Sequence, residues 1–236
     1  MKIAIMQPYV FPYLGYFQLI NAVDKFIFFD DVGFIKQGWI NRNNILLNKS
    51  KHRFTIPIQK KSSNKTIRET QISKNPHHWN FKLLNTIRHA YQNAPYFKFV
   101  FPIVESILKD CIDKSIGDVA INSIEKVLEY IGVVQFFGKI GGEKHLKLSE
   151  KIVDICKKEN ATTYINAIGG QAFLSKNYFE TQNIELKFLK ANLKPYKQSA
   201  FSNQSSAFFA GLSIIDVLMY NSVEMVREML EDYTLI

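Results

Sequence analysis

Two short runs of almost continuous apolar residues open the chain, at residues 2–6 (KIAIM) and 25–30 (KFIFFD). Such runs are typical of strands that are buried on both faces of a parallel sheet. Between them, apolar residues recur with a helical period over residues 15–23. The pattern therefore predicts a strand, a helix and a second strand, which is the βαβ unit of an α/β protein.

The same patterns predict further elements along the chain. Strands are expected at residues 53–58, 64–73, 162–168 and 184–191. Helices are expected at residues 76–91, at two segments within 102–131, and at 150–158, 213–218 and 223–231. Gly132 is a candidate C-cap and Ser149 a candidate N-cap. We predict one α/β domain over residues 1–236, with an N-terminal βαβ unit, a mostly parallel Rossmann-like sheet with helices, and a helical insertion around residues 76–132.

Composition places this pattern in a packed globular protein. Of the 236 residues, 47% are hydrophobic and 14% are aromatic, which is enough for a sizeable core. Cys111 and Cys156 lie in helical apolar patterns and are expected to be buried thiols, which fits a reducing cytoplasm better than a disulfide scaffold. No run approaches the ~20 apolar residues of a spanning helix, and the N-terminus lacks the features of a signal peptide. We therefore expect a cytoplasmic protein without a membrane span.

The net charge of +9 admits two interpretations. Basic residues concentrate between Lys36 and Lys65. A lysine-rich, solvated surface is the favoured interpretation, and attraction to an anionic partner such as a phosphorylated substrate is the other. No nucleic-acid-binding motif accompanies the basic residues.

Polar residues follow both N-terminal strands. Gln7 comes directly after the first strand, and Asp30 and Asp31 end the second. Ligands of such sheets bind beyond the carboxyl ends of the strands, so we expect these residues to converge on one crevice. The aspartates could serve as a base, orient an amine or bind a metal, or they could simply form a turn. Adjacent strand residues point to opposite faces, so both aspartates should not act on one atom.

An aromatic segment, residues 9–16, lies between Gln7 and the predicted helix. Tyr9 and Tyr16 could stack on a sugar or base and thus form a wall of the crevice. The alternative is that the aromatic residues of this segment pack in the core.

Two further segments are candidates for binding or proton transfer. The segment Trp39-Ile40-Asn41-Arg42-Asn43 follows Lys36, and Arg42 could hold a phosphate or carboxylate in bidentate fashion or form a surface salt bridge. His78 precedes Trp79 at a predicted helix start and could be a general base or merely a cap.

A predicted strand also runs into a glycine pair. Asn166 lies in this strand, and Gly169, Gly170 and Gln171 follow it. Paired glycines let a backbone approach an anion closely, although they also mark plain turns. The chain has no Gly-x-Ser-x-Gly, Walker A or Gly-x-Gly-x-x-Gly motif and no His/Cys cluster at zinc spacing, so it offers no standard nucleophile, and no metal site is predicted.

Several segments, in this order, resemble the WbqC-like protein family. They are IAIMQPYVFPYLGYFQLINAVDKFIFFDDV, IKQGWINRNNI, TIPI, HHW, YINAIGGQAF and PYKQ…F…LSIIDVLMYN. They cover most of the chain, and the Gln-Pro opening and the Trp-x-Asn-Arg segment are the most specific. The chain departs from the family pattern at residues 141–149, where similar proteins carry a shorter Asp-Lys-Ser.

The resemblance implies a biological setting. Similar proteins are associated with gene clusters for bacterial O-antigen (lipopolysaccharide) and other surface polysaccharides. The suggested role is transfer of glycine or another small acyl group to the amino group of a nucleotide-linked amino sugar, with dTDP or UDP as the nucleotide. The acyl donor could be an aminoacyl thioester, an aminoacyl-tRNA or an adenylate, and no cofactor is indicated.

The implied reaction assigns roles to the candidate residues. Asp30 or Asp31, with His78 as the alternative, would take a proton from the attacking amine. Asn41, Asn166 or a backbone N–H would stabilise the oxyanion. The candidate binding residues for the sugar nucleotide are Gln7, Tyr9, Tyr16, Lys36, Trp39, Asn41, Arg42, Asn166, Gly169, Gly170 and Gln171.

Two other functions stay open. The strand, the Gln7-Pro8 loop and the helix echo the strand–His-x-Gly-His–helix of nucleotidyltransferases, although the histidines are missing. The protein would then bind ATP and activate the amino acid itself. Alternatively, it is a non-catalytic binder of sugar nucleotides.

Overall fold

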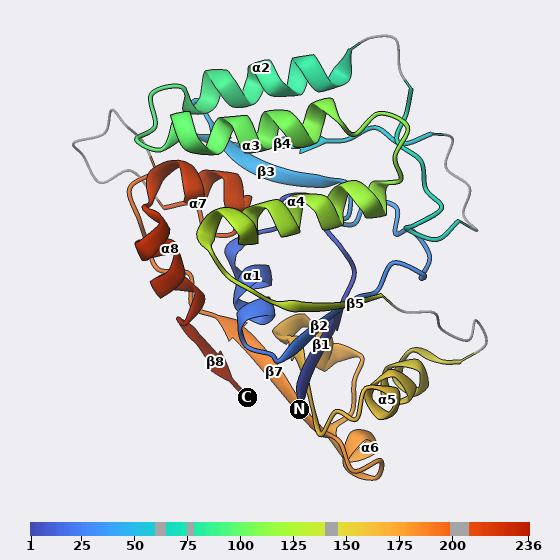
Figure 1. Ribbon diagram of the computed structural model, residues 1–236. Helices are drawn as coiled ribbons and strands as arrows, with labels where there is room; N and C mark the ends of the chain where they lie inside the picture. The colour runs from blue at the N-terminus through green and yellow to red at the C-terminus, as the bar shows by residue number, and fades with distance from the viewer. Residues whose placement is uncertain (60–64, 75–77, 140–145, 199–207) are drawn as a thin grey trace.

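The structure of the chain is a computed structural model, which describes residues 1–59, 65–74, 78–139, 146–198 and 208–236 (Figure 1). Its main feature is a six-stranded sheet in the order β5-β2-β1-β6-β7-β8. The strands are β1 (Lys2–Met6), β2 (Lys25–Phe28), β5 (Phe136–Lys139), β6 (Thr163–Ala167), β7 (Glu185–Ala191) and β8 (Tyr233–Leu235). All neighbours are parallel except β7 and β8. This confirms the predicted, mostly parallel Rossmann-like sheet.

The order of the strands places a topological switch point beside β1. The chain builds β1, β2 and β5 outward on one side, then returns to place β6 and β7 on the other side. In sheets of this kind, ligands bind beyond the carboxyl ends of the strands where the order reverses. The ends of β1, β2 and β6 are therefore the place to look for a site.

The helices cover the sheet in two layers because the buried strand residues alternate between its faces. Ala4 and Phe26 belong to one core cluster, which also contains residues of α1 (Leu14–Asn21). Ile3 and Ile27 belong to a second cluster on the opposite face, with residues of α5 (Leu148–Lys158) and α6 (Lys176–Glu180). Strands that are apolar at every position are buried in this way on both faces.

A long segment between β2 and β5 forms the upper layer of Figure 1. It contains the antiparallel hairpin of β3 (Arg42–Leu47) and β4 (Ser50–Thr55), then α2 (Trp79–Tyr91), α3 (Phe97–Lys109) and α4 (Ile116–Ile131). These helices confirm the predicted helical insertion. Gly132, with a φ of 66°, ends α4 in the left-handed conformation as predicted.

The C-terminal part returns to both layers. It contains the 3₁₀-helix η1 (Ile168–Ala172), α7 (Ile214–Tyr220), α8 (Val223–Leu230) and β8.

Cys111 and Cys156 are free and 0% exposed, which confirms the prediction of buried thiols. Among the described residues, no helix combines the length and the apolar character needed to cross a membrane.

Two local predictions were wrong. Residues 65–73 form turns and isolated bridges instead of the strand predicted at 64–73, because no neighbouring strand pairs with them; residues 60–64 lie outside the described parts. Ser149 is not the N-cap of α5, because the helix begins at Leu148 and Lys147 caps it. The backbone N–H of Lys147 donates to the Glu150 carboxylate. The hairpin strand β3, the edge strands β5 and β8, and α6 were not predicted.

Hydrogen bonds to three other segments hold the loop after β1 at Phe11. Phe11 is 1% exposed and adopts a φ of 44°, a left-handed conformation that is uncommon for a bulky residue. Its carbonyl accepts hydrogen bonds from Asn43 Nδ2 (2.7 Å) and Ser213 Oγ (2.8 Å). Its N–H donates to Ser123 Oγ at 3.0 Å. These contacts join β1 to β3, α4 and α7, so the Phe11 part of the aromatic segment packs in the core.

Candidate functional site

Gln7 and the aspartate pair lie at adjacent strand ends. Met6 pairs with Phe28 in the β1–β2 ladder, and the N–H of Phe29 donates to the Met6 carbonyl at 2.9 Å. Gln7 follows β1 directly, and Asp30 and Asp31 follow β2. The topology thus brings these residues to one edge of the sheet, as the sequence predicts. β6 ends at this same edge, on the other side of β1.

The two aspartates have different partners. Asp30 is 5% exposed and forms an ion pair with Arg68 at 2.5 Å. Asp31 forms an ion pair with Lys151 of α5 at 2.8 Å, with both side chains only about a tenth exposed (12% and 9%). Both aspartates lie beyond the end of β2, and their side chains reach cations in different segments. The two carboxylates therefore act in different environments.

A pocket of about 440 Å³ opens at the end of β2. Its lining includes Phe29, Asp31 and Lys151, together with Thr66 and Glu69 from the turn segment after the hairpin. The Lys151 ammonium lies 5.0 Å from the centre of the Phe29 ring, a cation–π distance. The pocket lining thus combines two carboxylates with one ammonium group.

One carboxylate oxygen of Asp31 lacks a hydrogen-bond donor among the described residues. Lys151 donates to its Oδ2 atom. Its Oδ1 atom is buried and has no hydrogen-bond partner among the described residues. A buried carboxylate oxygen without a donor is costly, so a donor supplied by a ligand would stabilise it. Asp31 is therefore the better placed of the two aspartates to meet an amine.

The predicted glycine site at the end of β6 has a different geometry from the one expected. Gly169 and Gly170 lie in η1, and the Gly170 carbonyl accepts from Phe173 and Leu174. A Cβ at Gly170 would collide with the Asn166 side chain, which explains the need for glycine there. Asn166 Oδ1 accepts from the Ala167 N–H at 2.8 Å. The pair thus forms a short 3₁₀ turn rather than an open anion-binding loop, and Gln171 is exposed beside it.

The predicted binding residues around Trp39 belong to the hairpin side of the molecule. Lys36 is exposed in the loop before it, and Trp39 is 47% exposed with the Arg53 guanidinium 5.8 Å from its ring. Asn41 is 4% exposed and donates to the Ile56 carbonyl at 2.7 Å. Its amide N–H thus closes the base of the hairpin, which speaks against its predicted role as an oxyanion donor. Arg42 begins β3, and its buried Nε has no partner among the described residues.

Only part of the aromatic segment reaches the surface. The Tyr16 ring is 3% exposed, and its hydroxyl donates to the Gln7 carbonyl at 3.0 Å. Burial raises the pKa of Tyr16 well above its ordinary value. Tyr16 therefore packs in the core and is not placed to stack on a ligand, contrary to the expectation. Tyr9 is partly exposed, with its ring 5.6 Å from that of Tyr16, and burial also raises its pKa.

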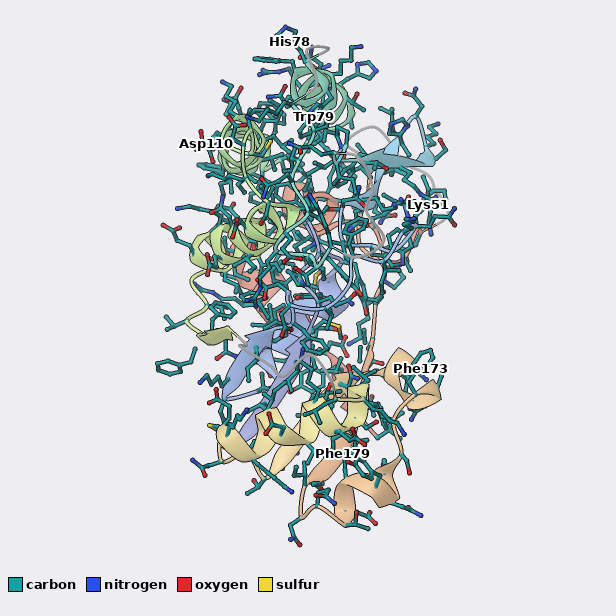
Figure 2. The ribbon with its side chains drawn as sticks, turned by 90° about the vertical axis from the view of Figure 1, so that its right-hand side faces the viewer. Lys51, His78, Trp79, Asp110, Phe173 and Phe179 are labelled. Atoms are coloured by element: carbon teal, nitrogen blue, oxygen red, sulfur yellow. The ribbon has the colours of Figure 1, made fainter. Side chains whose placement is uncertain are left out.

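His78 lies apart from the strand ends at which the base was expected. It is exposed, precedes α2 with a φ of 49°, and its ring contacts Phe81. Figure 2 shows His78 and Trp79 at one end of the molecule and Phe173, which follows η1, towards the other. The structure therefore separates His78 from the end of β6. His77 falls outside the described residues.

Sequence reasoning missed the two cations that pair with the aspartates. Lys151 lies 120 positions from Asp31, in a helix where a lysine is ordinarily solvent-exposed. Arg68 lies in a segment that was predicted to be a strand. Lys151 directly precedes the buried Ile152 in α5, and this position next to the apolar face of the helix is the signal that could have indicated its burial. In the described parts of the chain, no group of three or more His, Cys, Asp or Glu side chains is arranged to hold a metal.

A second buried polar cluster was also missed. Asp216 of α7 is 0% exposed and accepts hydrogen bonds from Tyr91 (2.8 Å) and Tyr196 (2.6 Å). Burial raises the pKa of Asp216 to about 6. The Tyr91 hydroxyl also accepts from the Leu46 N–H at 3.1 Å, so the cluster connects β3, α2 and α7.

Comparison with known proteins places the chain in a family. The sequence profile of the WbqC-like protein family matches residues 7–228, nearly the whole chain. The chain belongs to the WbqC-like protein family. The match includes the ends of β1 and β2, the hairpin, α5 and the Asp216 cluster. A relative from Mycobacterium tuberculosis (strain ATCC 25618 / H37Rv), named "Uncharacterized protein Rv1507c", is 25% identical over 220 residues, which are 92% of each chain. No solved structure matches the chain.

Proposed function

We propose that this WbqC-like protein transfers glycine or another small acyl group to the amino group of a nucleotide-linked amino sugar. The observation that carries the proposal is Asp31 in the pocket at the end of β2, where its buried Oδ1 atom has no hydrogen-bond donor among the described residues. A carboxylate oxygen of this kind favours an amine as its donor, and the position beside the switch point of a Rossmann-like sheet favours a nucleotide. The family resemblance supplies the setting in surface-polysaccharide synthesis, including O-antigen.

In this proposal Asp31 acts as the general base. The amine must lose a proton as it attacks the acyl carbonyl, and Asp31 Oδ1 is available to accept it. Lys151 donates to Oδ2 and orients the carboxylate. A C–N bond forms, the bond between the acyl carbon and its leaving group breaks, and the leaving group departs with the electron pair. No covalent intermediate on the protein is needed.

Exposed cations beside the pocket support binding of a diphosphate. Lys65 and Arg68 are exposed and flank Thr66 in the turn segment that forms one wall of the pocket. Arg68 pairs with Asp30, which leaves its side chain 41% exposed. Phosphate oxygens favour such arginine and lysine side chains. Asp30 would then position Arg68 and would not take part in proton transfer.

A panel of ligands tests binding. Thermal shifts would compare dTDP- and UDP-linked amino sugars with ATP, coenzyme A and bare nucleoside diphosphates. Stabilisation by an amino-sugar nucleotide beyond that of the bare diphosphate is the expected result. Stabilisation by ATP alone would favour the amino-acid-activating alternative instead, and no shift with any ligand would contradict the proposal.

A pair of neighbouring variants tests the base. Asp31→Asn should lower turnover by about 10²–10⁴-fold, the usual contribution of a general base, while sparing binding of the amino-sugar nucleotide. Asp30→Asn is the matched control, because it removes one carboxylate at the adjacent position and should mainly weaken nucleotide binding. A greater loss of turnover in Asp30→Asn would assign the base to Asp30. Unchanged turnover in both variants would contradict the mechanism.

A further inference from the structure

The net positive charge of this protein comes from one stretch of the chain. Residues 32–104 contain 13 of the 30 lysines and arginines but only one of the 21 acidic residues, Glu69. Four of the five histidines also lie there. Outside this stretch, acidic residues slightly outnumber basic ones. In the structure its described residues include the hairpin β3–β4, α2 and the first part of α3, which lie in the upper part of Figure 1.

Many of these cations are exposed and unpaired. Among the described residues, no carboxylate lies within ion-pair distance of six exposed side chains in this layer, namely Lys36, Lys49, Arg53, Lys65, Lys82 and Lys98. A merely solvated surface would interleave both signs of charge. A face with one sign of charge and few counter-ions of its own is instead suited to a polyanion.

Exposed aromatic rings lie within the same layer. Trp39, Phe81 and Phe99 are 47%, 50% and 63% exposed. Trp39 lies beside Arg53, and Phe81 contacts His78, so two of the three rings are next to a basic or imidazole group. Basic side chains interleaved with exposed rings are the arrangement by which proteins hold single-stranded nucleic acid, because phosphates bind the cations and bases stack on the rings.

A pocket of about 320 Å³ completes this surface. It lies where the tip of the hairpin meets the end of α2, and it is lined by Lys49 and His89 together with the amide side chains of Asn48, Gln92 and Asn93. Leu46 and Tyr220 contribute apolar surface, and no carboxylate is among the lining residues. Amides can hydrogen-bond the edges of a base, and the two basic groups can hold its phosphate. The pocket therefore suits an unstacked nucleotide.

We propose that the surface formed by the described residues of this stretch, in the hairpin, α2 and the start of α3, binds RNA, and that this RNA is the acyl donor of the transfer reaction. The second part rests on the proposed function: the donor is an aminoacyl ester of an RNA 3′ end. Figure 2 shows Lys51, in the hairpin, and His78, at the start of α2, in the same half of the molecule, above Phe173 and Phe179. The loop at the end of β2 contacts this layer directly, since the N–H of Arg68 donates to the Asp30 carbonyl and that of Ile67 to the Val32 carbonyl.

The donor chemistry balances without a further reactant. The sugar amine attacks the ester carbonyl, a C–N bond forms, and the bond from the acyl carbon to the ribose oxygen breaks. The proton lost by the amine passes to Asp31, and the departing ribose oxygen takes up a proton to become a hydroxyl. An ester is thus converted into an amide, so no nucleotide hydrolysis and no nucleophile of the protein are required.

Binding to deacylated RNA tests the surface by itself. The full chain would be titrated into labelled deacylated tRNA, with DNA of matched length and phosphatidylglycerol vesicles as competitors. The charge reversals Lys49→Glu and Lys82→Glu together should weaken binding at least about tenfold and reduce its salt dependence. The matched control is Lys176→Glu with Lys190→Glu, which changes the net charge equally at exposed positions of α6 and β7 and should leave binding within about twofold.

The outcomes separate this inference from the proposed function. No RNA binding, equal losses in both double variants, or displacement by vesicles rather than by nucleic acid would overturn it, even if acyl transfer from a small thioester succeeded. RNA binding together with transfer from glycyl-tRNA, lowered in Lys49→Glu/Lys82→Glu, would support it. RNA binding without transfer from any donor would overturn the donor assignment along with the proposed reaction.

Discussion

Lys151 and Asp31 form an ion pair at 2.8 Å between α5 and the end of β2, two segments far apart in the chain. Both side chains are about nine-tenths buried, and the pair lines the pocket beside the switch point of the sheet. Charges in such a position are desolvated, so each depends on the other. The pair lies at the edge where sheets of this kind bind ligands, which is compatible with the role proposed for Asp31.

We predict that the Lys151–Asp31 pair is energetically coupled. Lys151→Met should lower the free energy of unfolding by about 3 kcal/mol, because the Asp31 carboxylate is left buried without a counter-charge. Adding Asp31→Asn should restore part of the loss, so that the double variant is more stable than the sum of the single effects by at least about 1 kcal/mol. Urea unfolding of the four proteins measures the coupling.

The exposed pair Lys126–Glu129 in α4 provides a control for this cycle. Its side chains are 47% and 69% exposed at an N–O distance of 2.7 Å. Solvent screening should keep its coupling to a few tenths of a kcal/mol, below about 0.5. A coupling between Lys151 and Asp31 as small as this would contradict our view of a desolvated pair.

Much of the sheet could be predicted from the sequence because its signals are local. β1, β2, β6 and β7 are runs that are apolar at nearly every position, and this pattern alone indicates burial on both faces. The same reasoning places Gln7 and the Asp30–Asp31 pair at strand ends. The expectation that the two aspartates do not act on one atom stays a prediction, and in the structure they pair with different cations.

The rest depends on contacts between distant segments. β3 is formed by RNNILL, whose polar half suggested a binding segment rather than a strand, and only pairing with β4 makes it one. Tyr16 looked available for stacking, yet its helix is buried on nearly every side. The partners Lys151 and Arg68 reach the aspartates only through the fold. Sequence patterns carry no information on such pairings.

We predict that both cysteines are unreactive in the native protein. Burial raises the pKa of Cys111 to about 11 and that of Cys156 to about 12, so neither forms a thiolate near neutral pH. A thiol reagent at pH 8 should label neither residue rapidly, and denaturation should release both. Ser106→Cys, at an exposed position of α3, should add one fast-reacting thiol as a positive control. Rapid labelling of a native cysteine would contradict the prediction.

We predict that Asn43 stabilises the loop after β1. Its amide donates to the Phe11 carbonyl, and its Oδ1 accepts from the Asn44 N–H at 2.8 Å. Asn43→Ala should lower the free energy of unfolding by about 1–3 kcal/mol, since the buried Phe11 carbonyl loses a donor and the unusual Phe11 conformation loses a restraint. Asn177→Ala, at an exposed position of α6, should cost well under about 1 kcal/mol. Equal effects on stability would show that Asn43 does not hold the loop.

We predict that stability depends on the ionisation of Asp216. Its native pKa of about 6 lies above the unfolded value near 3.8, so the folded protein binds this proton more tightly than the unfolded chain. The contribution is therefore fully present below about pH 4 and is lost as the pH rises through about 6. A shift of about two units corresponds to roughly 3 kcal/mol.

The variant Asp216→Asn isolates this contribution, because an amide in its place does not titrate. The difference in unfolding free energy between the variant and the native protein should change by roughly 3 kcal/mol between pH 4 and pH 7, in favour of the variant at higher pH. Glu129→Gln removes a carboxylate that is 69% exposed and controls for the loss of one surface charge. If the difference in unfolding free energy between Asp216→Asn and the native protein did not change with pH, the prediction would be contradicted. The hydrogen bonds from Tyr91 and Tyr196 would then offset the whole cost of burying the carboxylate.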